Sequence, residues 1–243
     1  MLYHSLRAPQ EGLYVDQYAV RLRGALDAAA FAEAWRRTVE RHSTFRTAFV
    51  WEGLSKPVQV VRRQVDLPWD ELDWRDEAAT TERLNALART QRSAGLELAR
   101  APVMQFTLAH IGEDDALFLW SYHHLLLDGW SVGTLQEVFA QYQALRDGRT
   151  LALPPAPRYS AYIAWLKEQD HEKAEGYWRG ALEGWQHPTP LPRSRAVPRR
   201  GGPATHVLPL VLPADQTAAV QEAARASRLT VNTLLQGALA LTL

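Results

Sequence analysis

Cysteine is absent from the 243 residues of the chain. The protein therefore has neither a disulfide framework nor a thiolate nucleophile. An excess of one charge is also lacking, because 27 lysine and arginine residues balance 27 aspartate and glutamate residues. This balance removes the simplest case for nucleic acid or an anionic membrane as a partner.

Long apolar runs are missing as well, and no stretch of about 18 apolar residues indicates a membrane span. Residues 1–7 lack the charged segment followed by an apolar segment that marks a secretory signal. We therefore expect a cytoplasmic protein. The length allows one or two domains with their own cores, and nine Trp and eight Tyr residues fit an ordered chain, because disordered chains are poor in aromatic residues.

Apolar periodicity predicts strands that alternate with helices. Strands are expected at residues 14–22, 47–51, 57–61, 103–110 and 116–124. Turn residues at 112–115 join the last two strands in a predicted hairpin, whereas residues 66–74 read as irregular. Helices are expected from a cap at Asp27 to about His42, and at residues 77–95, 131–147, 159–182 (in one piece or two) and 214–227.

A boundary is predicted between Trp185 and Pro203, where five prolines and four arginines accumulate. Such a stretch sustains neither a helix nor a central strand. A strand at 205–212 is expected to follow it. Residues 232–243 are almost all apolar and end without a cap, so we expect that the chain stops inside a longer domain.

The most informative segment is an apolar run that ends in His123 and His124 and is followed by Asp128 and Gly129. Histidine can act as a base near neutral pH, because its unperturbed pKa is about 6.5. If the two histidines lie at the end of a strand, their side chains point to opposite faces of the sheet. One imidazole then faces a substrate, and the other faces the layer behind it and must form hydrogen bonds there.

Asp128 cannot be assigned from spacing alone. Its plainest role is to cap the helix expected near Ser131, where a carboxylate accepts hydrogen bonds from backbone N–H groups. A metal site has little support, because no Glu lies between the histidines and no third ligand follows at helical spacing.

Four ordered segments resemble motifs of the condensation domains of nonribosomal peptide synthetases. Residues 123–131 resemble the HHxxxDG motif, residues 41–49 resemble RHExLRTxF, residues 159–165 resemble YxDYAxW, and residues 1–6 resemble the second half of the first motif. The sequence departs from these patterns at three positions: Ser43 replaces Glu, Phe45 replaces Leu and Ala161 replaces Asp.

The resemblance implies an α/β fold, in which a mixed sheet flanked by helices forms one lobe of a two-lobed, V-shaped domain like chloramphenicol acetyltransferase. Residues 1–184 would be the N-terminal lobe with the HHxxxDG motif, residues 185–204 a Pro/Arg-rich linker, and residues 205–243 the start of an incomplete C-terminal lobe. The chain would then be about half of the domain and inactive alone.

The resemblance also implies a reaction. This family forms an amide (peptide) bond between an acyl or peptidyl thioester on one carrier and an amine on another. By resemblance His124 faces the tunnel through which carrier-bound substrates reach the site, and His123, Asp128 and Gly129 complete the catalytic motif. Asp128 would be a structural carboxylate paired with an arginine, with Arg46 as the first candidate and Arg41 as the second; the alternative for both arginines is an exposed charge at a helix end.

The implied partners are upstream and downstream peptidyl carrier domains and an adjacent adenylation domain, with no nucleic acid and no membrane. No cofactor would be bound directly, because the substrates arrive on the phosphopantetheine of the carriers. Relatives that epimerise or form esters share the motif and remain alternatives, as does a fragment that only docks a carrier. We further expect His42 to be a packing residue at a helix end, and Trp35, Trp120 and Trp165 to lie in the core.

Overall fold

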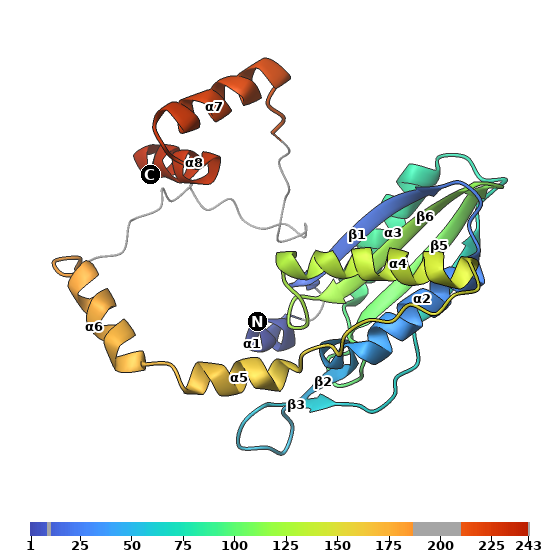
Figure 1. Ribbon diagram of the computed structural model, residues 1–243, viewed down its shortest axis with the longest axis horizontal. Coiled ribbons are helices and arrows are strands. Elements are labelled where there is room, and N and C mark those ends of the chain that lie inside the picture. Colours follow the sequence, from blue (N-terminus) through green and yellow to red (C-terminus); the bar gives the residue numbers. More distant parts are fainter. Residues whose placement is uncertain (9–10, 187–209, 243) are drawn as a thin grey trace. The chain divides into compact units, whose positions relative to one another are not determined.

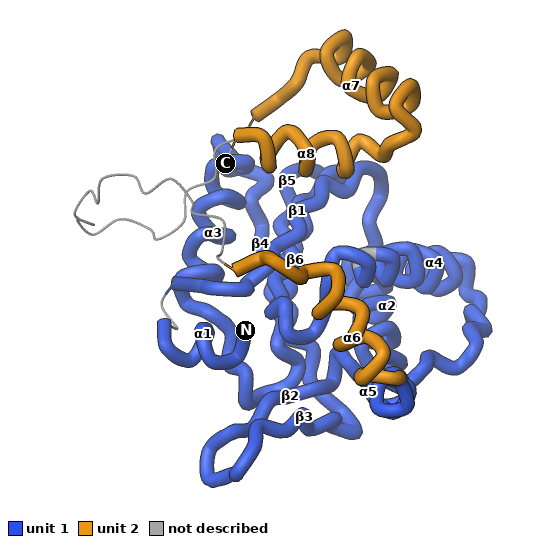
Figure 2. Tube along the Cα trace, turned by 90° about the vertical axis from the view of Figure 1, so that its left-hand side faces the viewer, with its two compact units in different colours: residues 1–169 blue, residues 170–243 orange. Residues whose placement is uncertain are grey.

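The computed structural model describes residues 1–8, 11–186 and 210–242, and Figure 1 follows their helices and strands along the chain. The chain divides into two units, residues 1–169 and residues 170–243 (Figure 2). The first unit contains every described strand and the histidine motif.

A four-stranded sheet forms the centre of the first unit. Its strands lie in the order β1 (Val15–Arg23), β6 (Asp115–His123), β5 (Met104–Gly112) and β4 (Trp69–Asp73). The β1–β6 and β5–β6 pairs are antiparallel, whereas β4 runs parallel to β5. A separate antiparallel ribbon consists of β2 (Thr47–Val50) and β3 (Val58–Val61), as predicted.

Helices cover both faces of the sheet (Figure 1). The helices of the first unit are α1 (Leu2–Arg7), α2 (Ala28–Arg41), α3 (Thr80–Ala94), α4 (Thr134–Arg146) and α5 (Tyr159–Lys167). Helices α2 and α4 lie over one face and α3 over the other. The predicted α/β fold, a mixed sheet flanked by helices, is confirmed.

Strand β6 contributes to the core on both of its faces. Phe118 and Trp120 pack in the cluster that contains Trp35 of α2, and Leu117 and Leu119 pack in the cluster under α3. A strand buried on both faces has a continuous apolar sequence rather than an alternating one. This explains the apolar run that leads to the histidines.

Several predicted details are confirmed. The Asp27 side chain caps α2 by accepting a hydrogen bond from the Ala30 N–H at 2.9 Å. Trp35 and Trp120 are fully buried. The helix expected from residue 131 begins at Thr134, because a 3₁₀ turn (Gly129–Gly133) precedes it.

Two predictions about the fold of the first unit were wrong. Residues 66–74 are not irregular throughout, since they include β4 at the edge of the sheet. Strand β4 lacks an apolar pattern, because an edge strand exposes polar side chains to water. These side chains are Asp70, Glu71 and Asp73. Trp165 is not a core residue among the described parts of the chain: it is 52% exposed on α5.

The second unit contains α6 (His171–Ala181), α7 (Ala214–Ala226) and α8 (Val231–Thr242). The helical stretch 159–182 is therefore two helices, and Asp170 caps the second by accepting from the Lys173 N–H. The strand expected at 205–212 does not form at residues 210–212, and its other residues lie outside the described part. The linker from residue 187 onward lies there too, so the boundaries at 184 and 204 stay predictions. No helix that the structure describes is long and apolar enough to cross a membrane.

Candidate functional site

His123, the last residue of β6, is buried, with 2% of its surface exposed. Its Nδ1 accepts a hydrogen bond from the Leu125 N–H at 3.1 Å, which leaves the ring proton on Nε2. Nε2 lies 3.0 Å from the Ser5 hydroxyl oxygen, and that hydroxyl donates to the Met1 carbonyl at 3.4 Å. Both ring nitrogens therefore have partners inside the protein, as expected for the imidazole that faces the layer behind.

The electrostatics of His123 favour a neutral ring. Burial lowers the pKa of His123 to about 4, because the charged imidazolium is costly to remove from water. Protonation would also place an N–H group on Nδ1, where the Leu125 N–H already needs an acceptor. His123 is thus neutral near pH 7 and supports the structure around the site.

His124 lies on the opposite face and is one-third exposed, with a side-chain exposure of 34%. Its backbone N–H donates to the Tyr14 carbonyl at 2.8 Å, which fixes the main chain at the end of β6. The ring Nδ1 lies 2.6 Å from Oδ2 of Asp16 on β1. Because an ionised carboxylate can only accept, Nδ1 carries a proton, and in the neutral form of the ring Nε2 is the nitrogen with the lone pair. The predicted opposite orientation of the two imidazoles is confirmed, with His124 as the open one.

A cavity of about 360 Å³ lies beside His124. Its lining joins the C-terminal end of α2, the β2–β3 ribbon and the loop after β6, so that polar and apolar groups face the same space. The lining includes His42, Phe45, Phe49, His124, Leu126 and Asp128.

Asp128 caps the turn that follows the histidines. Its Oδ1 accepts hydrogen bonds from the Trp130 and Ser131 N–H groups, both at 3.1 Å, and from the Ser131 hydroxyl at 2.9 Å. The Ser131 hydroxyl foremost, together with these backbone groups, holds the pKa of Asp128 below its usual value. Asp128 is exposed, so the capping role is the one that the geometry favours.

The expected pairing of Asp128 with an arginine is wrong for the described residues. Arg46 donates instead to the backbone carbonyls of Glu40, Arg62 and Arg63. Its guanidinium therefore braces the β2–β3 ribbon against the end of α2, and the Asp128 carboxylate is satisfied within its own turn.

Arg41, the second candidate, is also engaged elsewhere: it donates to Glu137 at 2.6 Å and to the Pro154 carbonyl. His42 Nε2 lies 2.9 Å from the same Glu137 oxygen. Glu137 thus ties the end of α2 to α4 next to the cavity. His42 does pack at a helix end, with its ring against Phe45, and it lines the cavity as well.

Gly129 lies in the 3₁₀ turn just after Asp128. A Cβ at this position would meet no other atom within 4 Å among the described residues. Its φ is also not among the positive values that favour glycine. The described part of the chain therefore does not itself require glycine here.

Asp16 was missed by the sequence argument. It is the one acidic residue in the predicted strand 14–22, and aspartate is depleted in strands. That signal could have drawn attention to Asp16. The pairing with His124 could not be predicted, because it depends on the register between two strands far apart in the sequence.

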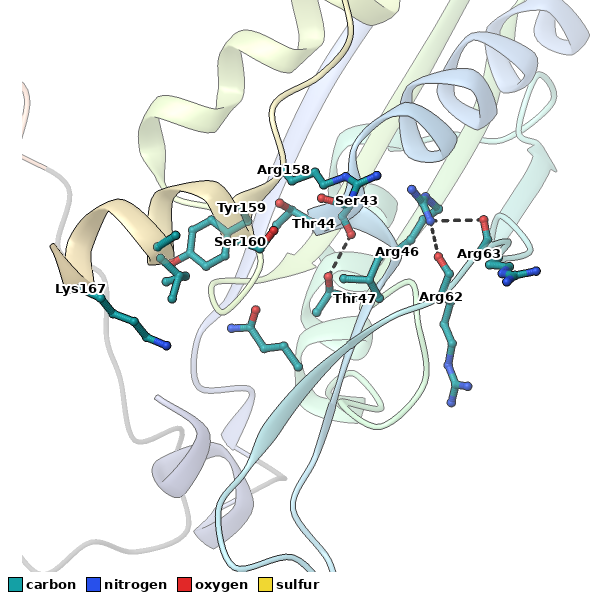
Figure 3. A pocket seen from close by; sticks show the side chains of 14 residues that line it. Ser43, Thr44, Arg46, Thr47, Arg62, Arg63, Arg158, Tyr159, Ser160 and Lys167 are labelled. Atoms are coloured by element: carbon teal, nitrogen blue, oxygen red, sulfur yellow. Dashed lines mark hydrogen bonds between the residues drawn. The ribbon is translucent and has the colours of Figure 1, made fainter.

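A second and larger cavity, of about 810 Å³, is drawn in Figure 3. The two share Thr44, Thr47, Gln59 and Tyr159 in their linings. Among the described residues, the larger cavity has no acidic side chain in its lining. Its five positive side chains are Arg158 just before α5, Lys167 at the end of α5, and Arg46, Arg62 and Arg63 of the β2–β3 region.

The similarity to known proteins covers the whole chain. The chain is 42% identical over 247 residues to one of the proteins that make up the linear gramicidin synthase of Brevibacillus parabrevis, covering 100% of this chain and 5% of that protein. It is 40% identical over 237 residues to chondramide synthase cmdD of Chondromyces crocatus, covering 96% of this chain and 6% of that protein. The chain thus spans about one-twentieth of the length of these relatives.

Solved structures share the fold. The first condensation domain of the calcium-dependent antibiotic synthetase, in complex with a substrate analogue, superposes with a TM-score of 0.75 at 21% identity. The superposition covers 95% of this chain and 55% of that one, so the chain spans about half of the solved domain. The family model described as "Condensation domain" matches residues 1–243. The chain therefore belongs to the condensation-domain family.

Proposed function

We propose that this chain supplies the reactive histidine of a domain that forms peptide bonds between two carrier-bound substrates. The observation that carries the proposal is the orientation and exposure of the His124 ring. Its Nδ1 is held at 2.6 Å by Asp16, and its ring is open beside a cavity. A neutral imidazole with a free Nε2 is the form that can accept a proton.

The chemistry asked of this group is simple. The amine nitrogen of one substrate attacks the thioester carbonyl of the other, forming a C–N bond and a tetrahedral oxyanion. Nε2 of His124 takes the proton that the amine loses, the C–S bond then breaks, and the proton passes to the departing thiolate. The thiol and the amide are the products, and no covalent intermediate on the protein is needed.

Delivery of the substrates on phosphopantetheine is supported by the charge of the larger cavity. The phosphodiester of such an arm is an anion, and Arg and Lys side chains are its usual partners. The five positive side chains belong to the lining of the larger cavity (Figure 3), and that lining is partly shared with the cavity beside His124. Upstream and downstream carrier domains and an adjacent adenylation domain are the partners we propose, as in multidomain synthetases.

The test of the proposed function is made in the complete two-lobed domain that contains this chain, with donor and acceptor carriers loaded. His124→Ala should lower the rate of amide formation by about 10²- to 10⁴-fold, the usual contribution of a positioned acid or base. His110→Gln is the matched control, since His110 is another carboxylate-paired histidine of the same sheet, 2.7 Å from Glu71, and does not line the cavity beside His124.

The readouts also separate the alternatives. Unchanged amide formation in His124→Ala would refute the proposal. A complete domain that inverts the donor residue without forming amide would identify an epimerising relative. Product made only with alcohol acceptors would identify an ester-forming one.

We also propose that residues 1–243 alone make negligible product. His124 is one-third exposed in the described structure, so water reaches its ring there. Misplacement of a tethered reactant by about 1 Å can cost roughly a hundredfold in rate. The same carrier assay compares this chain with the complete domain, and comparable product from both would overturn this part of the proposal.

A further inference from the structure

The pair Asp16–His124 links two strands of the central sheet. The carboxylate oxygen Oδ2 lies 2.6 Å from Nδ1, at the short end of the range for hydrogen bonds that involve an ionised group. Both side chains are partly exposed, 43% for Asp16 and 34% for His124. Asp16 makes no other side-chain hydrogen bond to a described residue.

The strand register explains why these two side chains meet. In the β1–β6 ladder Val15 lies opposite His123 and Asp16 lies opposite Tyr122. His124 is two residues beyond Tyr122 on the same face, so it is the diagonal neighbour of Asp16, within reach of longer side chains. The Tyr14 carbonyl accepts the His124 N–H at 2.8 Å, and this bond holds the backbone of both partners in one ladder.

Closely packed aromatic rings lie beneath the pair. The ring of Tyr18 stacks on that of Tyr122 at a centroid distance of 6.1 Å, and Trp120 lies 4.7 Å from Tyr122 on the same face. Tyr122 and Trp120 are both buried. Asp16 therefore approaches the His124 ring from a strand whose neighbouring side chains are closely packed.

We propose that Asp16 is a positioning residue, which holds the His124 ring in the Nδ1–H tautomer and so presents the unprotonated Nε2 to the cavity. The inference rests on the proposed function of His124 for its catalytic consequence, but the tautomer itself can be measured without any reaction. The opposite tautomer at His123, fixed by the Leu125 N–H and Ser5, indicates that local partners decide the tautomer of each ring separately.

The first experiment reads the tautomer. The complete domain, labelled with ¹⁵N at histidine, is studied by NMR at pH 8, and the His124 signals are assigned by their loss in His124→Ala. In the wild-type protein Nδ1 should carry the proton. In Asp16→Ala the signals should move toward the Nε2–H form. Glu71→Gln, which removes the carboxylate beside His110, should leave the His124 signals unchanged.

The second experiment reads catalysis in the same domain with loaded carriers. Asp16→Ala should lower kcat by at least tenfold, and on the order of a hundredfold, with little change in KM, because loss of the orienting group affects proton transfer rather than carrier binding. Asp16→Glu should recover part of the rate, and circular dichroism establishes that each variant is folded.

The outcomes distinguish the two proposals. An unchanged His124 tautomer in a folded Asp16→Ala variant overturns this inference, whatever the rate. A tautomer that changes with no loss of kcat also overturns the positioning role. Full activity in His124→Ala refutes the proposed function of His124, and the NMR result then still reports on the pair alone.

Discussion

Acid should destabilise this protein through His123. Burial lowers the pKa of His123 to about 4 in the folded chain, whereas a histidine in an unfolded chain titrates near about 6.5. Between these two pKa values the unfolded state binds a proton at His123, whereas the folded state does not. Stability from the neutral ring is fully present above about pH 6.5 and is lost as the pH falls toward 4.

The size of the effect follows from the two pKa values. The linkage relation predicts a loss of about 2 kcal/mol in the free energy of unfolding at pH 5 and about 3 kcal/mol at pH 4, relative to pH 7.5. This is a large share of the stability of an ordinary domain. Protonation would at the same time remove the acceptor that the Leu125 N–H uses.

The assay is urea unfolding between pH 7.5 and 4, followed by the tryptophan fluorescence of the chain, to which the buried Trp35 and Trp120 contribute. His123→Asn keeps an acceptor close to the Leu125 N–H but does not titrate. The difference in unfolding free energy between wild type and this variant should fall by about 2 kcal/mol from pH 7.5 to pH 5. His110→Gln, which alters an exposed pair, should follow the wild-type curve. A difference between wild type and His123→Asn that stays constant with pH would refute the reasoning.

Three further predictions concern stability, each measured by urea unfolding at pH 7.5. Ser5→Ala should lower the free energy of unfolding by about 1–3 kcal/mol, because it leaves the buried Nε2–H of His123 without an acceptor; no loss would argue against the assigned tautomer. Glu137→Gln should cost about 1–3 kcal/mol, since Arg41 and His42 share this side chain, which is 15% exposed. The control Glu175→Gln, at an exposed pair on α6, should stay within about 0.5 kcal/mol, and equal losses in both would contradict the role of burial. Asp128→Asn should shift the unfolding midpoint less than Ser5→Ala does, because Asp128 caps an exposed turn and is not part of a buried ion pair. A larger shift would favour the hypothesis that Asp128 is paired with an arginine.

Much of the first unit could be predicted because its patterns are local. The Asp27 cap, the hairpin of β5 and β6 and the β2–β3 ribbon all depend on residues close together in the chain. Strand β4 was missed because its evidence is not local. Its polar residues become a strand only by pairing in parallel with β5, about 35 residues further along.

The charged residues of the motifs show a different kind of error, because the partners that they take are local in the sequence and the capping role of Asp128 was among the roles expected. Arg46 and Asp128 carry opposite charges, and the motif resemblance joined them, but each finds acceptors or donors close by in its own part of the fold. Trp165 illustrates the converse. A large aromatic residue is usually a core residue, yet it is exposed on α5 in the described structure, since composition does not determine which helix face is covered.

The histidine pair shows most clearly what the sequence determines and what the tertiary structure decides. Adjacency on a strand by itself determined that the two imidazoles face opposite ways, because successive side chains alternate along an extended backbone. The motif resemblance indicated that His124 is the open one, but only the tertiary structure supplied the partners that bury His123 and orient each ring. Ser5 is 118 residues from His123, and Asp16 is 108 residues from His124. Hydrogen bonds over such separations exist only once the sheet has brought its strands and the first helix together.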